Sequence, residues 1–206
     1  MPKSIKGQAH VPTQQEFKRL LKVVAASKHP KRDTLLIYMS FGLGLRAVEL
    51  AALKIKDVLK ENYHVKEIIN LQRTKNNKPR PVYLPDKSED ARIHDALIDY
   101  INYRKVYAEK KRATFSFSQP LFLSQKGTGF TNKGMQKVFE RIYREAGLVG
   151  CSSHSGRRTF ATNLIEQGID IKAVSTLMGH ASVAMTAQYV ENNPTRLRKI
   201  AAKALY

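Results

Sequence analysis

The sequence predicts a mainly α-helical domain with a small antiparallel β-sheet, an α+β fold. Three observations predict it. Most of the 206 residues fall in segments whose apolar positions repeat at helical spacing. Two short segments on either side of a polar loop have the pattern of a β-hairpin. No linker rich in Gly, Ser or Pro divides the chain, and 42% apolar residues are enough for one sizeable core.

The N-terminal helices follow from capping and apolar spacing. Residues 13–16 are a capping-box signature, and apolar residues follow them at helical spacing. The segment 34–41 is apolar almost all round, which predicts a buried helix, and a third helix is expected over about 46–53. Residues 1–12 are expected to form a basic arm ahead of a single domain over 13–206.

A change of period marks the expected sheet. Residues 63–72 and 80–84 have the composition of short strands, and the polar segment between them is typical of a hairpin loop. Helical spacing returns over 90–106, whereas the basic segment 107–120 is expected to be an exposed loop.

The C-terminal part is expected to be helical throughout. Its helices are bounded by capping residues at their starts and by glycines at their ends. They are expected over 132–146, 159–167 and 170–179, with another from Ser182 that carries Tyr189 and a basic amphipathic tail over 194–206.

The charge of the chain indicates a polyanionic partner. Lys and Arg number 36 against 17 Asp and Glu, a formal net charge of +19. Such a surface favours nucleic acid, with an anionic membrane as the second candidate. No apolar run approaches the roughly 20 residues that span a bilayer, and the N-terminus has no apolar signal core. We therefore expect double-stranded DNA as the partner and no membrane.

Cysteine and histidine usage bounds the chemistry. The single cysteine, Cys151, excludes an internal disulfide and suits a reducing cytosol, and it is expected to be a small apolar filler. The six histidines have no Cys, Asp or Glu at metal-ligand spacing. We expect no metal and no other cofactor.

Several residues together suit attack on a phosphodiester. They are a tyrosine, two histidines, two arginines and a lysine, with a glutamate three residues after the first arginine. In chain order the candidate catalytic residues are Arg46, Lys75, His154, Arg157, His180 and Tyr189, and the supporting residue is Glu49.

The two arginines can compensate for the weak nucleophilicity of a phenol. A phenol has a pKa near 10, so Tyr189 attacks poorly at neutral pH without help. Arg46 and Arg157 can clamp the non-bridging phosphate oxygens and stabilise the charge that grows on them. Because guanidinium stays protonated, that field is permanent. Glu49 is expected to orient Arg46 or His154.

The remaining residues supply hydrogen bonds and protons. His180 can donate to the same phosphate oxygens, and His154 can accept the Tyr189 proton or hydrogen-bond the phosphate. The departing 5′-oxygen needs a proton, which Lys75 in the hairpin loop could deliver. Lys78 lies on the same loop and is the alternative donor or a phosphate contact.

The order of these motifs resembles the catalytic domain of the tyrosine recombinase (phage integrase) family. The motifs are GLGLRAVEL, a lysine in a β-hairpin, HSGR, and GH followed nine residues later by tyrosine, and the match runs from Thr13 onward. The resemblance implies a site-specific recombinase or integrase of mobile elements that forms a 3′-phosphotyrosine without metal or ATP. A type IB topoisomerase and a non-catalytic DNA-binding protein of the same fold are the alternatives.

The chain departs from the family in two places. Members usually carry a core-binding domain before the catalytic domain, so the resemblance implies a minimal member that lacks it, with a piece of a longer protein as the alternative. A minimal member would compensate for the missing domain with its charge, with a homo-oligomer on DNA, from dimer to tetramer, or with an accessory DNA-binding protein. Arg158 follows Arg157 where many relatives have His, and is expected to contact a phosphate or to be a structural substitute.

The resemblance also bears on the tail and on the location of the protein. The tail 194–206 resembles a C-terminal helix that docks on a neighbouring subunit, and packing on its own domain is the alternative. The expected location is the prokaryotic cytoplasm or nucleoid.

Overall fold

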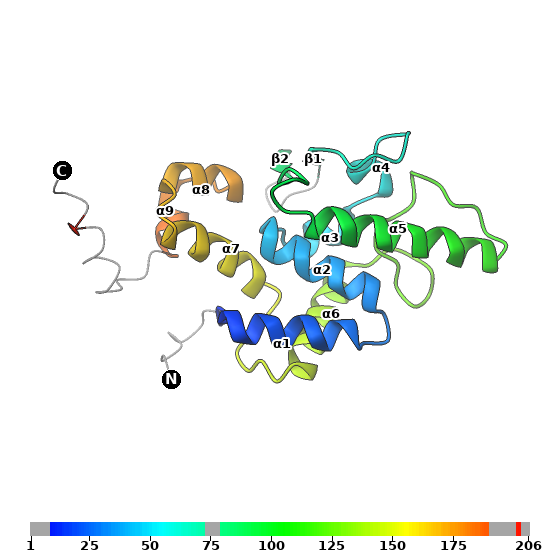
Figure 1. The fold of residues 1–206 in the computed structure, drawn as a ribbon, viewed down its shortest axis with the longest axis horizontal. Coiled ribbons are helices and arrows are strands. Elements are labelled where there is room, and N and C mark those ends of the chain that lie inside the picture. The colour runs from blue at the N-terminus through cyan, green and yellow to red at the C-terminus, as the bar shows by residue number, and fades with distance from the viewer. Residues whose placement is uncertain (1–8, 73–78, 190–200, 203–206) are drawn as a thin grey trace.

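The computed structural model describes residues 9–72, 79–189 and 201–202, and it confirms the α+β fold (Figure 1). Helices dominate, and one two-stranded sheet lies at an edge of the helical body. In chain order the elements are α1 (Gln14–Ala25), α2 (Pro30–Gly42), α3 (Ala47–Ala52), α4 (Ile55–Val58), β1 (Ile68–Leu71), β2 (Arg80–Tyr83), α5 (Arg92–Lys110), α6 (Asn132–Glu145), α7 (Ser155–Glu166), α8 (Ile171–Met178) and α9 (Val183–Ala187).

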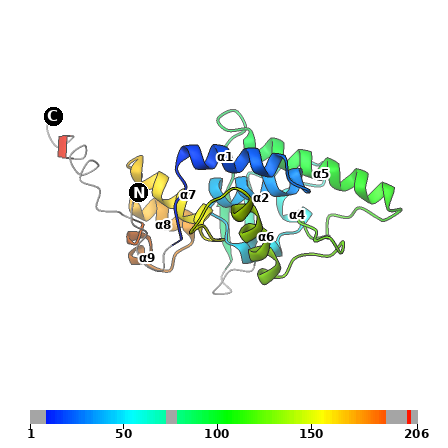
Figure 2. The same ribbon diagram turned by 90° about the horizontal axis from the view of Figure 1, so that it is seen from below.

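Helix α2 is the centre of the main core. It packs against α1, α5 and α7, and its apolar positions are buried on several sides, as the run over 34–41 predicts. It begins earlier, at Pro30, because proline fits the first helical turn, where its missing N–H has no intrahelical partner. Figure 2 shows α1 lying across this core with α6 beside it.

The hairpin is antiparallel, with Ile68 opposite Tyr83 and Leu71 opposite Arg80. Alternate residues of β2 face inward, and Arg80 is one of the buried ones. The loop that joins the strands carries Lys75 and Lys78, which lie outside the described residues.

Helix α5 is longer than the sequence predicts. The expectation of a loop from residue 107 is wrong over its first turn, because the helix continues to Lys110. Ala108 is buried there, and Lys and Glu are good helix formers. The buried Arg104 also holds α5 to the following segment, since Nη1 donates to the carbonyls of Pro120 and Leu121 at 2.8 and 2.7 Å.

A second, smaller apolar cluster joins α7 to α8. Its buried members are Ala161, Ile165, Val174 and Met178, and Tyr189 packs against them. In Figure 1 these helices form the end of the molecule opposite the C-terminal end of α5. The tail 194–206 lies outside the described residues except for positions 201 and 202, which are helical.

The segment before α1 is attached to the domain over residues 9–12. His10 N donates to Gly150 O at 2.9 Å, and Arg158 Nη1 donates to Ala9 O at 2.7 Å. Arg158 therefore holds residue 9 against α7.

Candidate active site

Arg46 and Glu49 form one unit at the start of α3. Arg46 is the extended N-cap residue, so the helix begins one residue later than predicted. The Glu49 carboxylate accepts from Arg46 N at 2.8 Å and from Arg46 Nη1 at 2.9 Å. One carboxylate thus both caps the helix and fixes the guanidinium. The sequence predicts that Glu49 orients Arg46 or His154, and the structure places Glu49 in contact with Arg46.

Arg80 is a member of this cluster that sequence reasoning missed. From β2 its Nη2 donates to Glu49 Oε2 at 2.9 Å and its Nε donates to Glu49 Oε1 at 3.2 Å. The alternation of side chains along the strand could have identified it, because Arg80 and Val82 both face inward. A buried arginine at such a position needs a carboxylate partner.

The two arginines keep Glu49 ionised. Burial alone would raise the pKa of this fully enclosed carboxyl, but hydrogen bonds and charge from Arg80, and then from Arg46, bring the pKa below its usual value. Arg46 keeps part of its side chain accessible, whereas Arg80 is buried. Arg46 is therefore accessible to a bound group, whereas Arg80 supports Glu49 from within the fold.

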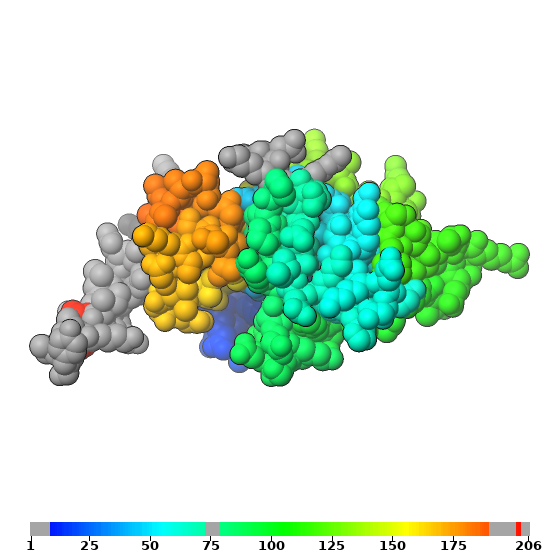
Figure 3. All heavy atoms as spheres, turned by 90° about the horizontal axis from the view of Figure 1, so that it is seen from above, coloured from blue at the N-terminus to red at the C-terminus, as the bar shows by residue number. Residues whose placement is uncertain are grey.

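Arg157 connects the α2–α3 turn to the end of α8. Its guanidinium donates to Gly44 O at 2.6 Å and also to Met178 O. Arg80 Nη1 donates to the neighbouring carbonyl, Leu177 O, at 3.0 Å. The last carbonyls of a helix lack intrahelical partners and carry partial negative charge, so two guanidiniums stabilise the end of α8. Figure 3 shows α8 beside the segment that includes β2 on this face.

His180 follows the end of α8 through a close-packed glycine. Gly179 has φ +59°, and a Cβ there would lie 2.3 Å from Arg80 Cδ, so a side chain is excluded. The His180 Nδ1 shares a 2.8 Å hydrogen bond with the buried Thr186 hydroxyl. The Tyr189 ring stacks on His180 with centroids 5.9 Å apart. The candidate nucleophile is thus held beside the end of α8.

The cluster carries excess positive charge. Burial first, and then the charge of Arg46, lower the pKa of Arg157 to about 9, and the pKa of His180 falls to about 4 through burial and the charge of Arg157. His180 is neutral at pH 7. When its Nδ1 accepts from Thr186, its Nε2 carries a proton to donate. Three arginines against Glu49 leave a net charge of 3 − 1 = +2, which suits a phosphate.

Two further residues considered from the sequence lie just before α7. His154 is exposed at the N-cap of α7, one turn before Arg157. Cys151 is half-buried, and burial raises the pKa of its thiol to about 11. It packs against the main core, as the apolar-filler interpretation predicts.

Two searches of the described residues bear on metals and membranes. Within 9–72 and 79–189, no three His, Cys, Asp or Glu side chains come together as a group that could hold a metal ion. Among the helices of the same ranges, none has both the length and the apolar character needed to cross a bilayer.

Tyr189 thus lies beside His180 and near the buried Arg157, on a basic helical domain. The chain belongs to the phage integrase family, whose model matches residues 11–196. It is 28% identical over 204 residues to the tyrosine recombinase XerA of Pyrococcus furiosus, covering 99% of this chain and 62% of that protein.

Solved structures of recombinases are also similar to this chain. A crystal structure of XerA recombinase has a TM-score of 0.71 at 26% identity and covers 100% of this chain and 67% of that chain. A structure of XerH site-specific recombinase bound to its difH substrate has a TM-score of 0.69 at 26% identity, and covers 100% of this chain and 57% of that chain. The chain therefore spans about three fifths of the curated relative's length.

Proposed function

We propose that this chain is the catalytic domain of a site-specific DNA recombinase or integrase. It would cleave and rejoin strands of double-stranded DNA through a 3′-phosphotyrosine intermediate without metal or ATP. The observation that carries the proposal is the grouping of Arg46, Arg157 and His180 beside Tyr189 with an uncompensated positive charge. A scissile phosphate supplies the anion that this cluster lacks.

The proposed reaction is a balanced transesterification. The Tyr189 oxygen attacks phosphorus, the bond from phosphorus to the 5′-oxygen breaks, and the tyrosine becomes joined to the 3′-phosphate. The phenol proton passes to His154 or to water, while Lys75 protonates the departing 5′-oxygen. Arg46, Arg157 and the Nε2–H of His180 stabilise charge on the non-bridging oxygens. A different 5′-hydroxyl reverses the step and joins new partners.

The comparisons favour recombination over the alternatives. The relatives above are named tyrosine recombinases or site-specific recombinases, and one of them is solved on its DNA substrate. A type IB topoisomerase would use similar chemistry without exchanging partners. A non-catalytic DNA-binding protein of this fold predicts the loss of a catalytic side chain, whereas every candidate is retained.

Covalent capture tests the nucleophile. On a duplex nicked just 3′ of the scissile phosphate, the short 5′-hydroxyl fragment diffuses away after cleavage, so a protein–DNA adduct should accumulate on a denaturing gel. The substrate should be drawn from DNA ends recovered by adduct mapping on a random library. Tyr189→Phe should abolish the adduct, because phenylalanine has no oxygen to attack phosphorus.

Tyr63→Phe is the matched control, since Tyr63 is an exposed tyrosine on another surface and should support full adduct formation. An adduct that persists in Tyr189→Phe would reject the assigned nucleophile.

A sulfur leaving group tests the general acid. Lys75→Ala should block cleavage of the ordinary 5′-oxygen ester but spare a 5′-bridging phosphorothiolate, because a thiolate leaves without a proton. Gel assays of both substrates measure the difference. Lys78→Ala is the neighbouring control and should leave the oxygen-to-sulfur ratio unchanged. Equal losses on both substrates for Lys75→Ala would contradict the role, and a selective loss for Lys78→Ala would transfer it to Lys78.

Assembly and location follow the same proposal. We infer that the protein acts as a dimer to tetramer on DNA, with the tail 194–206 docking on a neighbour and with an accessory DNA-binding protein as a further aid. Arg158 and Lys78 are proposed as phosphate contacts, and the prokaryotic cytoplasm or nucleoid is the proposed location. The net charge of +19 supports binding to DNA.

A further inference from the structure

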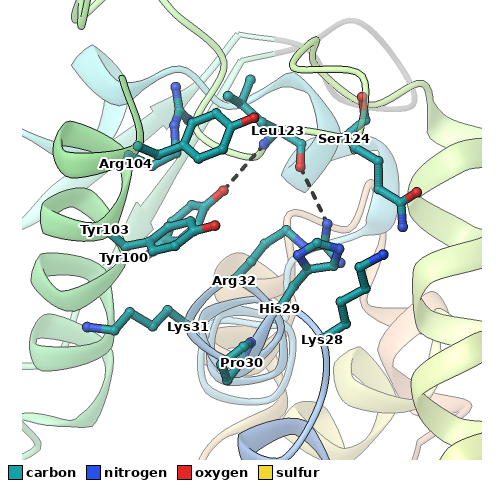
Figure 4. Close-up of a pocket in the computed structure, with 12 residues that line it drawn as sticks. Lys28, His29, Pro30, Lys31, Arg32, Tyr100, Tyr103, Arg104, Leu123 and Ser124 are labelled. Carbon is teal, nitrogen blue, oxygen red and sulfur yellow. Dashed lines mark hydrogen bonds between the residues drawn. The ribbon is translucent and has the colours of Figure 1, made fainter. Parts of the chain in front are cut away.

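A cavity lies away from the cluster formed by Arg46, Arg157 and His180. It has a volume of about 470 Å³ and is enclosed by the start of α2, by α5 and by residues 123–125 (Figure 4). Helix α2 separates the two places. Pro30 lines the cavity, while the other end of the helix leads to Arg46. At 1.5 Å per residue its 13 residues span about 20 Å, so one ligand group cannot occupy both places.

An aromatic wall forms one side of this cavity. Tyr100, Tyr103 and Tyr107 lie on one face of α5, and adjacent rings stack with centroids 6.2 Å apart in both pairs. Tyr100 is buried and its hydroxyl accepts from Leu123 N at 3.4 Å. Tyr103 and Tyr107 are 45% and 36% exposed. Their rings are therefore accessible for stacking with a planar group.

The charged lining is entirely basic. The residues around the cavity include four cationic side chains and no carboxylate. Two of the four are committed to the fold: Arg32 pairs with the buried Asp33, and Arg104 is held by backbone carbonyls. Lys28 makes no ion pair with the described residues, and Lys31 makes only an exposed contact of 3.6 Å to Asp99, which is weak. Figure 4 shows the two ammonium groups on opposite sides of the cavity, with Lys31 toward α5 and Lys28 toward residues 123–125. One anion therefore meets only one of them, and Lys28 is the one available.

His29 adds a neutral polar group at the same place. Its ring lies toward the cavity in Figure 4, and its enclosed Nε2 has no hydrogen-bond partner among the described residues. Burial, and then the charge of Arg32, lower the pKa of His29, so the ring is neutral at pH 7. A small ring movement would let it share a hydrogen bond with a bound ligand.

We propose that this cavity is a nucleotide-binding site, with the base stacked against Tyr103 and Tyr107 and the phosphate held by Lys28. A ligand with both a planar ring and a negative charge satisfies the two walls together. The volume lies within the range of roughly 300–1,000 Å³ of small-ligand sites. The nucleotide comes either from the free pool or from an unpaired position in a DNA strand. The proposal does not rest on the recombinase function.

Calorimetric titration with defined fragments tests the site. Deoxyadenosine monophosphate should bind one-to-one, whereas deoxyadenosine and deoxyribose 5-phosphate, which each lack one recognised group, should bind at least tenfold more weakly. Tyr103→Ala and Lys28→Gln should each weaken binding of the nucleotide at least tenfold. Tyr83→Ala and Lys18→Gln, which change exposed residues of the same types elsewhere, should not. Thermal melts establish that each variant is folded.

Two further arms complete the test. Single-stranded trideoxyadenylate that binds more tightly than the monophosphate identifies a DNA strand as the source, and equal or weaker binding identifies the free nucleotide. Tyr189→Phe should bind the nucleotide normally, which separates this site from the catalytic one. Failure of both the monophosphate and the trinucleotide to bind, or binding that Tyr103→Ala and Lys28→Gln leave unchanged, overturns the proposal.

Discussion

Glu49→Ala should lower the rate of covalent DNA attachment by about 10²–10³-fold, the scale of losing one transition-state donor. It should also destabilise the fold by about 3–5 kcal/mol, the scale of removing one partner from a buried ion pair. The carboxylate is fully enclosed and holds Arg46 and Arg80 at once. Its removal leaves Arg80 buried without a counter-charge and Arg46 without a fixed position. Single-turnover cleavage and denaturant unfolding measure the two losses.

Asp57→Ala is the matched control for Glu49→Ala. Asp57 caps the neighbouring α4 by accepting from Lys54 N at 2.8 Å, as Glu49 does from Arg46, but among the described residues it pairs with no arginine. Its loss should cost about 1 kcal/mol of stability and leave cleavage unchanged. Wild-type cleavage by folded Glu49→Ala would show that the cluster does not position Arg46.

Acidification should also lower the stability that Glu49 gives to the fold. Because the pKa of Glu49 is lowered in the folded state, its contribution to stability is full at neutral pH and is lost as the pH falls through that lowered value. Glu49→Ala should therefore be less sensitive to acid than the unmodified chain in the same unfolding measurement.

Gly156→Ala should destabilise the protein by about 1–3 kcal/mol, as overpacked substitutions do. A Cβ on Gly156 would lie 2.3 Å from Ser40 Oγ and 2.8 Å from Phe41 Cδ2. The first turn of α7 must then move away from α2, and Arg157, the next residue, moves with it. Cleavage should fall more than the fraction of folded protein does, as measured by adduct formation at a temperature where thermal melts show the variant folded.

A second substitution can relieve this overpacking. Ser40 Oγ is buried and has no hydrogen-bond partner in the described part of the chain, so Ser40→Ala alone should be close to neutral. Added to Gly156→Ala, it removes the nearest obstructing atom and should recover part of the stability and part of the cleavage. The contact with Phe41 remains. No recovery in the double variant would place the strain elsewhere.

Spacing along the chain predicted the elements whose apolar faces are buried. It also predicted the residues that meet at the end of α8, since Arg157, His180 and Tyr189 lie close in sequence; their catalytic roles stay predictions. Arg80 was missed because one inward-facing arginine in a strand gives no signal until its distant carboxylate is known. The extension of α5 to Lys110 was missed because polar composition there reflects exposure and not the end of a helix.

The two guanidiniums at the end of α8 make this site a product of long-range folding. Leu177 receives its hydrogen bond from a residue 97 positions earlier, and Arg157 reaches back 113 positions to Gly44. Contacts of such high contact order form late, after the intervening chain is organised. A nascent, truncated or locally unfolded chain therefore has an unassembled centre. For a protein proposed to cleave DNA, that topology makes assembly of the cleavage centre depend on completed folding.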